Sequence, residues 1–177
     1  VMHGAGITVL DSVLPLAVPG EWSPPQSKPS EQDGIVRLLF VGRFVASKGL
    51  GDLLQALRLL LDHGHADLPV LELCMVGNLT FSDRSLVEQI RQTAQELEQQ
   101  FSKRLSIRLL FGVTDSAKRE LMAAANLFVL PTYHEGFCVP IVEAISSGCT
   151  SPVGTRSATP WLIAGVLELS ASTAARL

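Results

Sequence analysis

Two acidic residues, Glu135 and Glu143, stand eight positions apart just after the apolar segment LFVLP at residues 127–131. Gly136 lets a ligand approach the backbone closely, and a helix start near Pro140 offers free N–H groups and a positive dipole to an anion. A carboxylate near such a helix start could accept hydrogen bonds from a ribose diol, which is the task we expect for Glu143. The alternative is that both are ordinary solvated side chains, one in a loop and one on a helix.

Two cations lie in the segment GRFVASKG, which follows the apolar run VRLLFVG at residues 36–42 and leads into a helix. Arg43 and Lys48 on one tight loop beside a helix N-terminus suit a diphosphate, which needs neutralising charge from fixed donors. As isolated features they would be solvated surface charges. Their expected place at the same sheet edge as Glu135 favours a binding site.

Apolar runs and helical spacings alternate along the middle of the chain. Runs such as VLELCMVG predict strands buried on both faces, and leucines at helical spacing predict a helix that Gly64 ends. The predicted order is strand 36–42, helix 49–64, strand 70–77, helix 83–101, strand 105–112, helix 115–126 with Asp115 as its N-cap, strand 127–131 and helix 140–148 with Gly148 just past its end. This alternation predicts a doubly wound parallel α/β sheet of Rossmann-like type, whose ligands bind at the carboxyl ends of the strands.

Length and composition favour one domain, because 177 residues with 47% hydrophobic content make one sizeable core. We expect a connector and Pro-rich linker at residues 1–34 and the Rossmann-like domain at residues 35–177. A net charge of −3 argues against nucleic acid as a partner. Cys74, Cys138 and Cys149 form no C-x-x-C pair, and no apolar stretch is long enough to span a membrane, so a reduced, cytoplasmic setting is expected.

The strings LLFVGRFVASKGLGDLLQAL and LFVLPTYHEGFCVPIVEAISSG together resemble the C-terminal domain of glycosyltransferase family 4, a retaining group 1 family with the GT-B fold. Its members carry a strand ending in Gly-Arg, a Lys five residues after that Arg, and a Glu-x7-Glu motif. All three features are present, and the resemblance spans roughly residues 36–150. It implies the C-terminal half of a GT-B enzyme of carbohydrate biosynthesis, with a UDP-, GDP- or ADP-sugar as donor.

By this resemblance, Arg43 and Lys48 grip the donor pyrophosphate, Glu143 holds the ribose hydroxyls and Glu135 faces the donor sugar. The implied catalytic set is Glu135, Arg43 and Lys48, and the implied donor-binding set is Gly42, Arg43, Lys48, Gly136, Phe137, Cys138, Val139 and Glu143. No metal or other cofactor is expected, because the fixed cations stabilise the leaving group and no Asp-x-Asp motif occurs. Retention could proceed through a covalent intermediate or by front-face departure. We favour the second, because the sequence offers no firm nucleophile and Glu135 is the sole candidate to test.

The sequence departs from the family pattern after Gly148, where Ser157 and Ala158 stand at positions that the family fills with glycines. The N-terminal acceptor-binding domain and the closing helices that usually follow the last strand are also missing, so we expect a C-terminally truncated fragment that is inactive alone. The full-length protein would transfer a hexosyl group to a glycan, lipid or small-molecule hydroxyl, in the cytoplasm or peripherally at a membrane. The alternatives are a non-catalytic nucleotide-binding or inert truncated module, and, within the same fold, a phosphorylase or a nucleotide-sugar epimerase.

Overall fold

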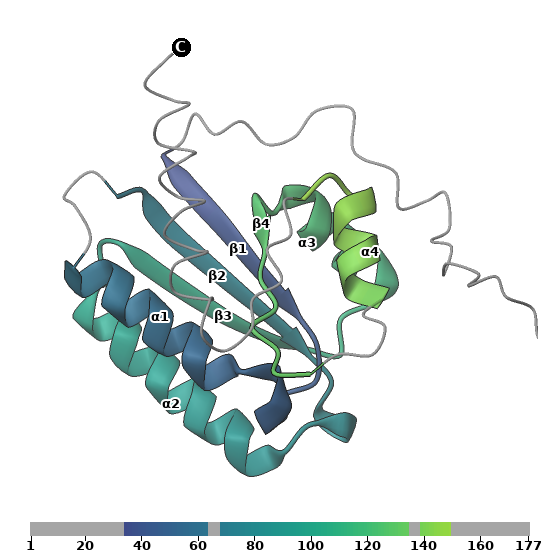
Figure 1. Cartoon of the computed structure of the whole chain (residues 1–177), viewed down its shortest axis with the longest axis horizontal. Coiled ribbons are helices and arrows are strands. Elements are labelled where there is room, and N and C mark those ends of the chain that lie inside the picture. The colour runs from purple at the N-terminus through teal and green to yellow at the C-terminus, as the bar shows by residue number, and fades with distance from the viewer. Residues whose placement is uncertain (1–33, 64–67, 135–138, 150–177) are drawn as a thin grey trace, which may run out of the picture.

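A computed structural model of the chain describes residues 34–63, 68–134 and 139–149 (Figure 1). Within them, a four-stranded sheet carries helices on both faces. The elements follow in the order β1 (Ile35–Val41), the 3-10 turn η3 (Ala46–Lys48), α1 (Leu50–His63), β2 (Val70–Gly77), the 3-10 turn η4 (Leu79–Phe81), α2 (Arg84–Gln100), β3 (Leu105–Phe111), α3 (Asp115–Ala124), β4 (Leu127–Phe128) and α4 (Val139–Ser146).

The strand order β3-β2-β1-β4 makes the sheet doubly wound. The first three strands step outward through α1 and α2, and α3 then returns the chain to the other side of β1, where β4 pairs. All the pairings are parallel. Figure 1 shows α1 and α2 together on one face of the sheet and α3 and α4 on the other. The predicted fold class is confirmed, and the switch in winding direction lies between β1 and β4.

The core explains why the apolar runs become strands. In β1, the consecutive residues Leu38, Leu39 and Phe40 are all buried, as a strand covered on both faces requires. Leu38 pairs with Leu73 of β2 and with Leu127 of β4, so the centre of the sheet is apolar across three strands. On α1, the buried positions recur at helical spacing from Leu50 to Leu61, namely Leu50, Leu53, Leu54, Ala56, Leu57 and Leu61.

Two predicted boundaries differ from the structure. The N-cap of α3 is Thr114, whose hydroxyl accepts a hydrogen bond from the backbone N–H of Ala117 at 3.2 Å, and Asp115 is the first helical residue. Thr114 takes this place because its backbone is extended while Asp115 is already helical. The strand predicted over 127–131 is shorter in the structure, where β4 is Leu127–Phe128; the Val129 N–H still donates to the Leu39 carbonyl at 2.8 Å, and Leu130 forms an isolated bridge.

Glycines were predicted to end both α1 and α4, but the structure describes only the one that follows α4. Gly148 directly follows the last turn of α4 with φ at 77°, a conformation that favours glycine, so its predicted role is confirmed. Gly64 lies outside the described residues, although α1 does end at His63. The domain boundary at residue 34 and the expected C-terminal truncation also concern residues outside the described part, so both stay predictions.

Helix length and cysteine state can be described for the residues that the structure covers, whereas the predicted compartment stays a prediction. None of the helices within residues 34–63, 68–134 and 139–149 has the length and apolarity needed to cross a bilayer. Cys74 and Cys149 are buried thiols, and the Cys149 thiol donates to the Met122 carbonyl; Cys138 lies outside the described residues. Burial raises the pKa of the Cys74 thiol, an effect that the Arg108 guanidinium partly opposes, so this cysteine is a packing residue rather than a nucleophile.

Candidate functional site

The cationic turn after β1 is anchored by an aromatic side chain. Arg43 is exposed, but the next residue, Phe44, is fully buried. The Phe44 ring lies 6.0 Å from the ring of Phe40 and 5.1 Å from that of Phe111, and the Phe44 carbonyl accepts a hydrogen bond from the N–H of Asp83 at 2.9 Å. These contacts fix the backbone that carries Arg43 at the carboxyl end of β1.

The same turn then passes directly against the chain that follows β4. Gly49 ends the 3-10 turn that carries Lys48, and its φ is 64°, in the left-handed region. A Cβ placed on Gly49 would overlap the carbonyl oxygen of Pro131. Glycine is therefore required twice here, once for its backbone conformation and once for the close approach. The requirement places Lys48 next to the segment after β4.

Hydrogen bonds join the two turns into one unit. The carbonyl of Ser47 accepts from the N–H of Tyr133 at 2.8 Å and from the hydroxyl of Thr132 at 3.0 Å. The Tyr133 hydroxyl in turn donates to Oδ2 of Asp52, in the first turn of α1, at 2.7 Å. The turn after β1 and the turn after β4 thus share a fixed relative position at the point where the sheet changes its winding direction.

Glu143 lies on α4, the helix that follows the β4 turn. It is buried, with only 7% of its surface exposed, so the alternative that it is a solvated helix residue is wrong. Its Oε1 accepts a hydrogen bond from Nζ of Lys118 on α3 at 3.0 Å. Within the described part of the chain, no group hydrogen-bonds to its buried Oε2. One carboxylate oxygen is held by a cation, and the other is available as an acceptor.

The structure describes five of the predicted site residues, namely Gly42, Arg43, Lys48, Val139 and Glu143. Glu135, Gly136, Phe137 and Cys138 lie outside the described residues, so their predicted roles stay predictions. Val139, which is exposed, begins α4, and Gly42 continues the ladder by donating to Val76 at 3.0 Å. The turn that carries Lys48 meets the β4 turn, from which the chain leads on to Glu143.

Sequence reasoning missed two features of this edge. The Lys118 partner of Glu143 comes from another helix, 25 positions away, and nothing in the local pattern indicates it. The contact of Gly49 with Pro131 was also missed, although a glycine directly after a short polar turn is a signal for the left-handed conformation. Both features supply fixed positions for residues that the sequence had already singled out.

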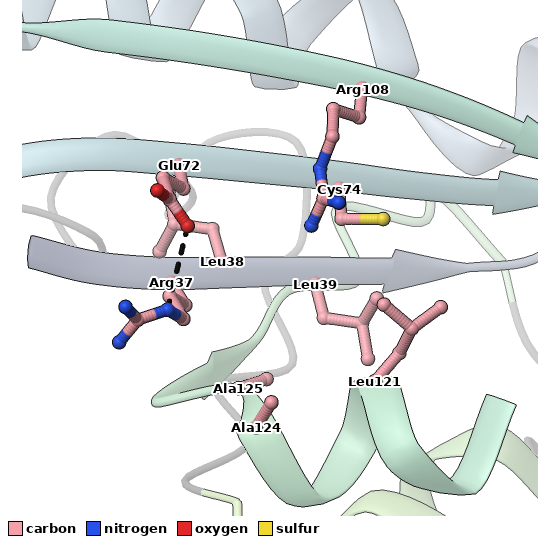
Figure 2. A pocket seen from close by; sticks show the side chains of 9 residues that line it. All are labelled: Arg37, Leu38, Leu39, Glu72, Cys74, Arg108, Leu121, Ala124 and Ala125. Atoms are coloured by element: carbon pink, nitrogen blue, oxygen red, sulfur yellow. Dashed lines mark ion pairs between the residues drawn. The ribbon is translucent and has the colours of Figure 1, made fainter. Parts of the chain in front are cut away.

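A cavity of about 30 Å³ lies elsewhere, between the sheet and α3 (Figure 2). It is close to the amino-terminal halves of the strands, where Arg37 of β1 and Glu72 of β2 form an ion pair at 3.4 Å. The residues around it are Arg37, Leu38, Leu39, Glu72, Cys74, Arg108, Leu121, Ala124 and Ala125. A space of this size holds a water molecule or two, so it is no candidate for a larger ligand. The chemistry-bearing residues lie at the opposite, carboxyl edge.

The fold and this edge define the class of protein: an α/β domain matching the C-terminal domain of GT-B glycosyltransferases. Comparison with known proteins then gives the family. The model of the family described as glycosyl transferases group 1 matches residues 25–153, so the chain belongs to this family. The narrower assignment to family 4 stays a prediction. No curated protein matches the chain by sequence.

Among solved structures, the chain is similar to the C-terminal domain of a glycosyl transferase group 1 family protein (LpcC) from Francisella tularensis. The identity is 16%, the match covers 88% of each chain, and the TM-score is 0.64. It is also similar to an α,α-trehalose 6-phosphate synthase from Burkholderia multivorans, with 17% identity over 71% of this chain and 30% of that one and a TM-score of 0.57.

A third similar structure is an α,α-trehalose-phosphate synthase (UDP-forming) from Burkholderia xenovorans in complex with glucose-6-phosphate. The identity is 15% over 65% of this chain and 27% of that one, with a TM-score of 0.57. At these identities the likenesses show the fold alone. The chain spans less than a third of the length of either synthase.

Proposed function

We propose that this chain is the donor-binding domain of a retaining glycosyltransferase, which transfers a hexosyl group from a nucleoside-diphosphate sugar to a hydroxyl acceptor. The acceptor would bind to another domain of a longer protein. Membership of the group 1 family supports the transferase activity. One of the similar structures is a UDP-forming synthase, which supports a nucleoside diphosphate as the leaving group.

The observation that carries the proposal is the junction of the two turns at the carboxyl edge. In doubly wound sheets, ligands bind at the point where the winding direction reverses, and here that point lies between β1 and β4. The close approach of Gly49 to Pro131 and the Ser47–Tyr133 hydrogen bond fix the Lys48 turn at this point. A cationic turn is thereby held beside the segment that leads to Glu143.

The chemistry that these residues would supply is stabilisation of a leaving group. When the bond from the anomeric carbon to the diphosphate breaks, negative charge develops on a phosphate oxygen. Arg43 and Lys48 would neutralise this charge from fixed positions, without requiring a metal ion. Glu143 would accept hydrogen bonds from the ribose hydroxyls through Oε2, which no group among the described residues engages. Whether retention proceeds by front-face departure or through Glu135 as a nucleophile stays open.

The test is calorimetric titration of the 177-residue chain with UDP, GDP and ADP and with the matching nucleosides. At least one diphosphate should bind at micromolar to millimolar concentration. A hydrogen bond to a charged group contributes about 1.5–3 kcal/mol, so Lys48→Met should weaken diphosphate binding by about 10- to 100-fold. The affinity for the matching nucleoside should change by less than about twofold.

Lys103→Met is the matched control, because Lys103 is an exposed lysine at the far end of α2, just before β3. It should leave every affinity unchanged. If none of the three diphosphates bound the wild-type chain at millimolar concentration, the donor site would be refuted. Equal losses of diphosphate and nucleoside affinity in Lys48→Met would instead remove Lys48 from the phosphate subsite.

A further inference from the structure

Lys118 is a largely buried lysine to which the proposed function has so far given no role. It lies in the first turn of α3, and its side chain is 20% exposed. Its Nζ is 3.0 Å from Oε1 of Glu143 and 3.6 Å from Oδ1 of Asp115. The Asp115 side chain is 84% exposed, so Glu143 is the more deeply buried of these two partners.

The Lys118–Glu143 ion pair connects α3 and α4, which are not consecutive elements because β4 lies between them along the chain. α3 precedes β4 and α4 follows it, and the two helices lie together on the face of the sheet opposite α1 and α2 (Figure 1). A buried carboxyl group needs a nearby cation or donor to replace its lost hydration. Lys118 supplies such a partner and also limits how far the carboxylate can rotate.

The two oxygens of Glu143 are therefore not equivalent. Oε1 is engaged by Lys118, whereas Oε2 is buried and has no hydrogen-bond partner in the part of the chain that the structure describes. An ionised carboxylate accepts at both oxygens, so the second one is left to take hydroxyl donors. A neighbouring pair of hydroxyls, such as a ribose diol, supplies donors of this kind.

We propose that Lys118 is a positioning residue, which acts through Glu143 to make the site select ribose over a pentose that lacks the 2′- and 3′-hydroxyls. It fixes Oε1 through their 3.0 Å contact, so that Oε2 meets the 2′- and 3′-hydroxyls of the bound nucleotide. This inference rests on the proposed function, since it requires a nucleoside diphosphate in the site. It adds the residue that makes Glu143 an effective acceptor.

The experiment compares UDP with 2′,3′-dideoxy-UDP, or the corresponding pair for whichever diphosphate binds wild type best. Wild type should prefer the ribonucleotide by about 10- to 100-fold, the range for hydrogen bonds to a charged acceptor. Lys118→Met should bring this ratio close to one, with the loss confined to the ribonucleotide. Lys118→Arg should restore most of the preference, and Lys103→Met should retain all of it. A role in folding alone would weaken both ligands equally.

A double-mutant cycle keeps the test decisive if Lys118→Met fails to fold, because Glu143→Gln removes the buried charge that Lys118 offsets. Glu143→Gln and Lys118→Met/Glu143→Gln should bind UDP equally. A further loss of affinity in the double variant would show a contact independent of Glu143 and overturn the inference. So would a Lys118→Met chain that keeps the wild-type preference, with the proposed function intact. Failure of wild type to bind any nucleoside diphosphate would instead refute the proposed function.

Discussion

Replacing Gly49 by alanine tests whether the turn after β1 is fixed against the turn after β4. Two separate effects oppose a side chain there. The φ of 64° costs a non-glycine residue about 1–2 kcal/mol, and the overlap of the new Cβ with the Pro131 carbonyl adds about 1–3 kcal/mol of strain. Together they predict that Gly49→Ala lowers the free energy of unfolding by about 2–5 kcal/mol.

Two other glycines separate these effects. Gly112 has a φ of 68°, but no atom lies within 4 Å of the position that a Cβ would take, so Gly112→Ala should lose only the backbone contribution of about 1–2 kcal/mol. Gly51 lies on α1 with open space around it and no positive φ, so alanine there should stabilise the chain by up to about 1 kcal/mol. The three variants should rank in stability as Gly51→Ala above Gly112→Ala above Gly49→Ala.

The assay is urea unfolding of each variant, followed by far-ultraviolet circular dichroism. The decisive quantity is the difference between Gly49→Ala and Gly112→Ala, because it isolates the contact with Pro131. Equal losses in the two variants would refute the close approach and with it the fixed junction of the turns. The same Gly49→Ala chain, at a temperature where it remains folded, should bind diphosphates more weakly, because its Lys48 turn has moved.

Two further predictions concern helix starts at the same edge. Thr114→Ala should lower the free energy of unfolding by about 1 kcal/mol through loss of the α3 N-cap, whereas Thr114→Ser should not; equal urea midpoints for the two would contradict the cap. The Ser85 hydroxyl and then the amides of Leu86 and Ser85 lower the pKa of Asp83, so the stability that Asp83 contributes is present above its unfolded pKa of about 3.8 and is lost as the pH falls through the folded value. The stability advantage of wild type over Asp83→Asn should therefore shrink between pH 7 and pH 3 in urea titrations, and a constant difference would contradict this assignment.

Local pattern was enough to predict most of the fold. Each strand of the sheet is a short apolar run, and burial of both faces favours a strand for a run such as VLELCMVG, which lies between two amphipathic helices. The alternation of strand and helix then restricts the topology through the handedness of βαβ crossovers. The remaining errors concern the first and last residues of helices and strands. At the start of α3, for example, Thr114 and Asp115 are both residue types that favour the N-cap position, and only their backbone dihedrals decide between them.

The residue types of the candidate site could be chosen from the sequence, but the contacts that hold them in place could not. Arg43, Lys48 and Glu143 were identified from their positions after strands, yet the sequence could not show that Gly49 approaches Pro131, because the two residues are far apart along the chain. Such contacts depend on how the sheet and the helices pack, and not on a period of 2 or 3.6 residues. The residues that hold the site in shape were therefore the ones that the sequence left out.

Glu143 shows what this packing contributes to the proposed donor site. Ala144 of α4 and Ser147, directly after the helix, are also buried, so the carboxylate lies among small buried side chains. A buried acceptor without a hydrogen-bond partner costs about 1–3 kcal/mol, and Lys118 satisfies only one of the two oxygens. A ligand that donates to Oε2 removes this cost in the folded state alone. Binding of a ribose diol at this position should therefore be linked to the stability of α3 and α4, the two helices that the Lys118–Glu143 pair connects.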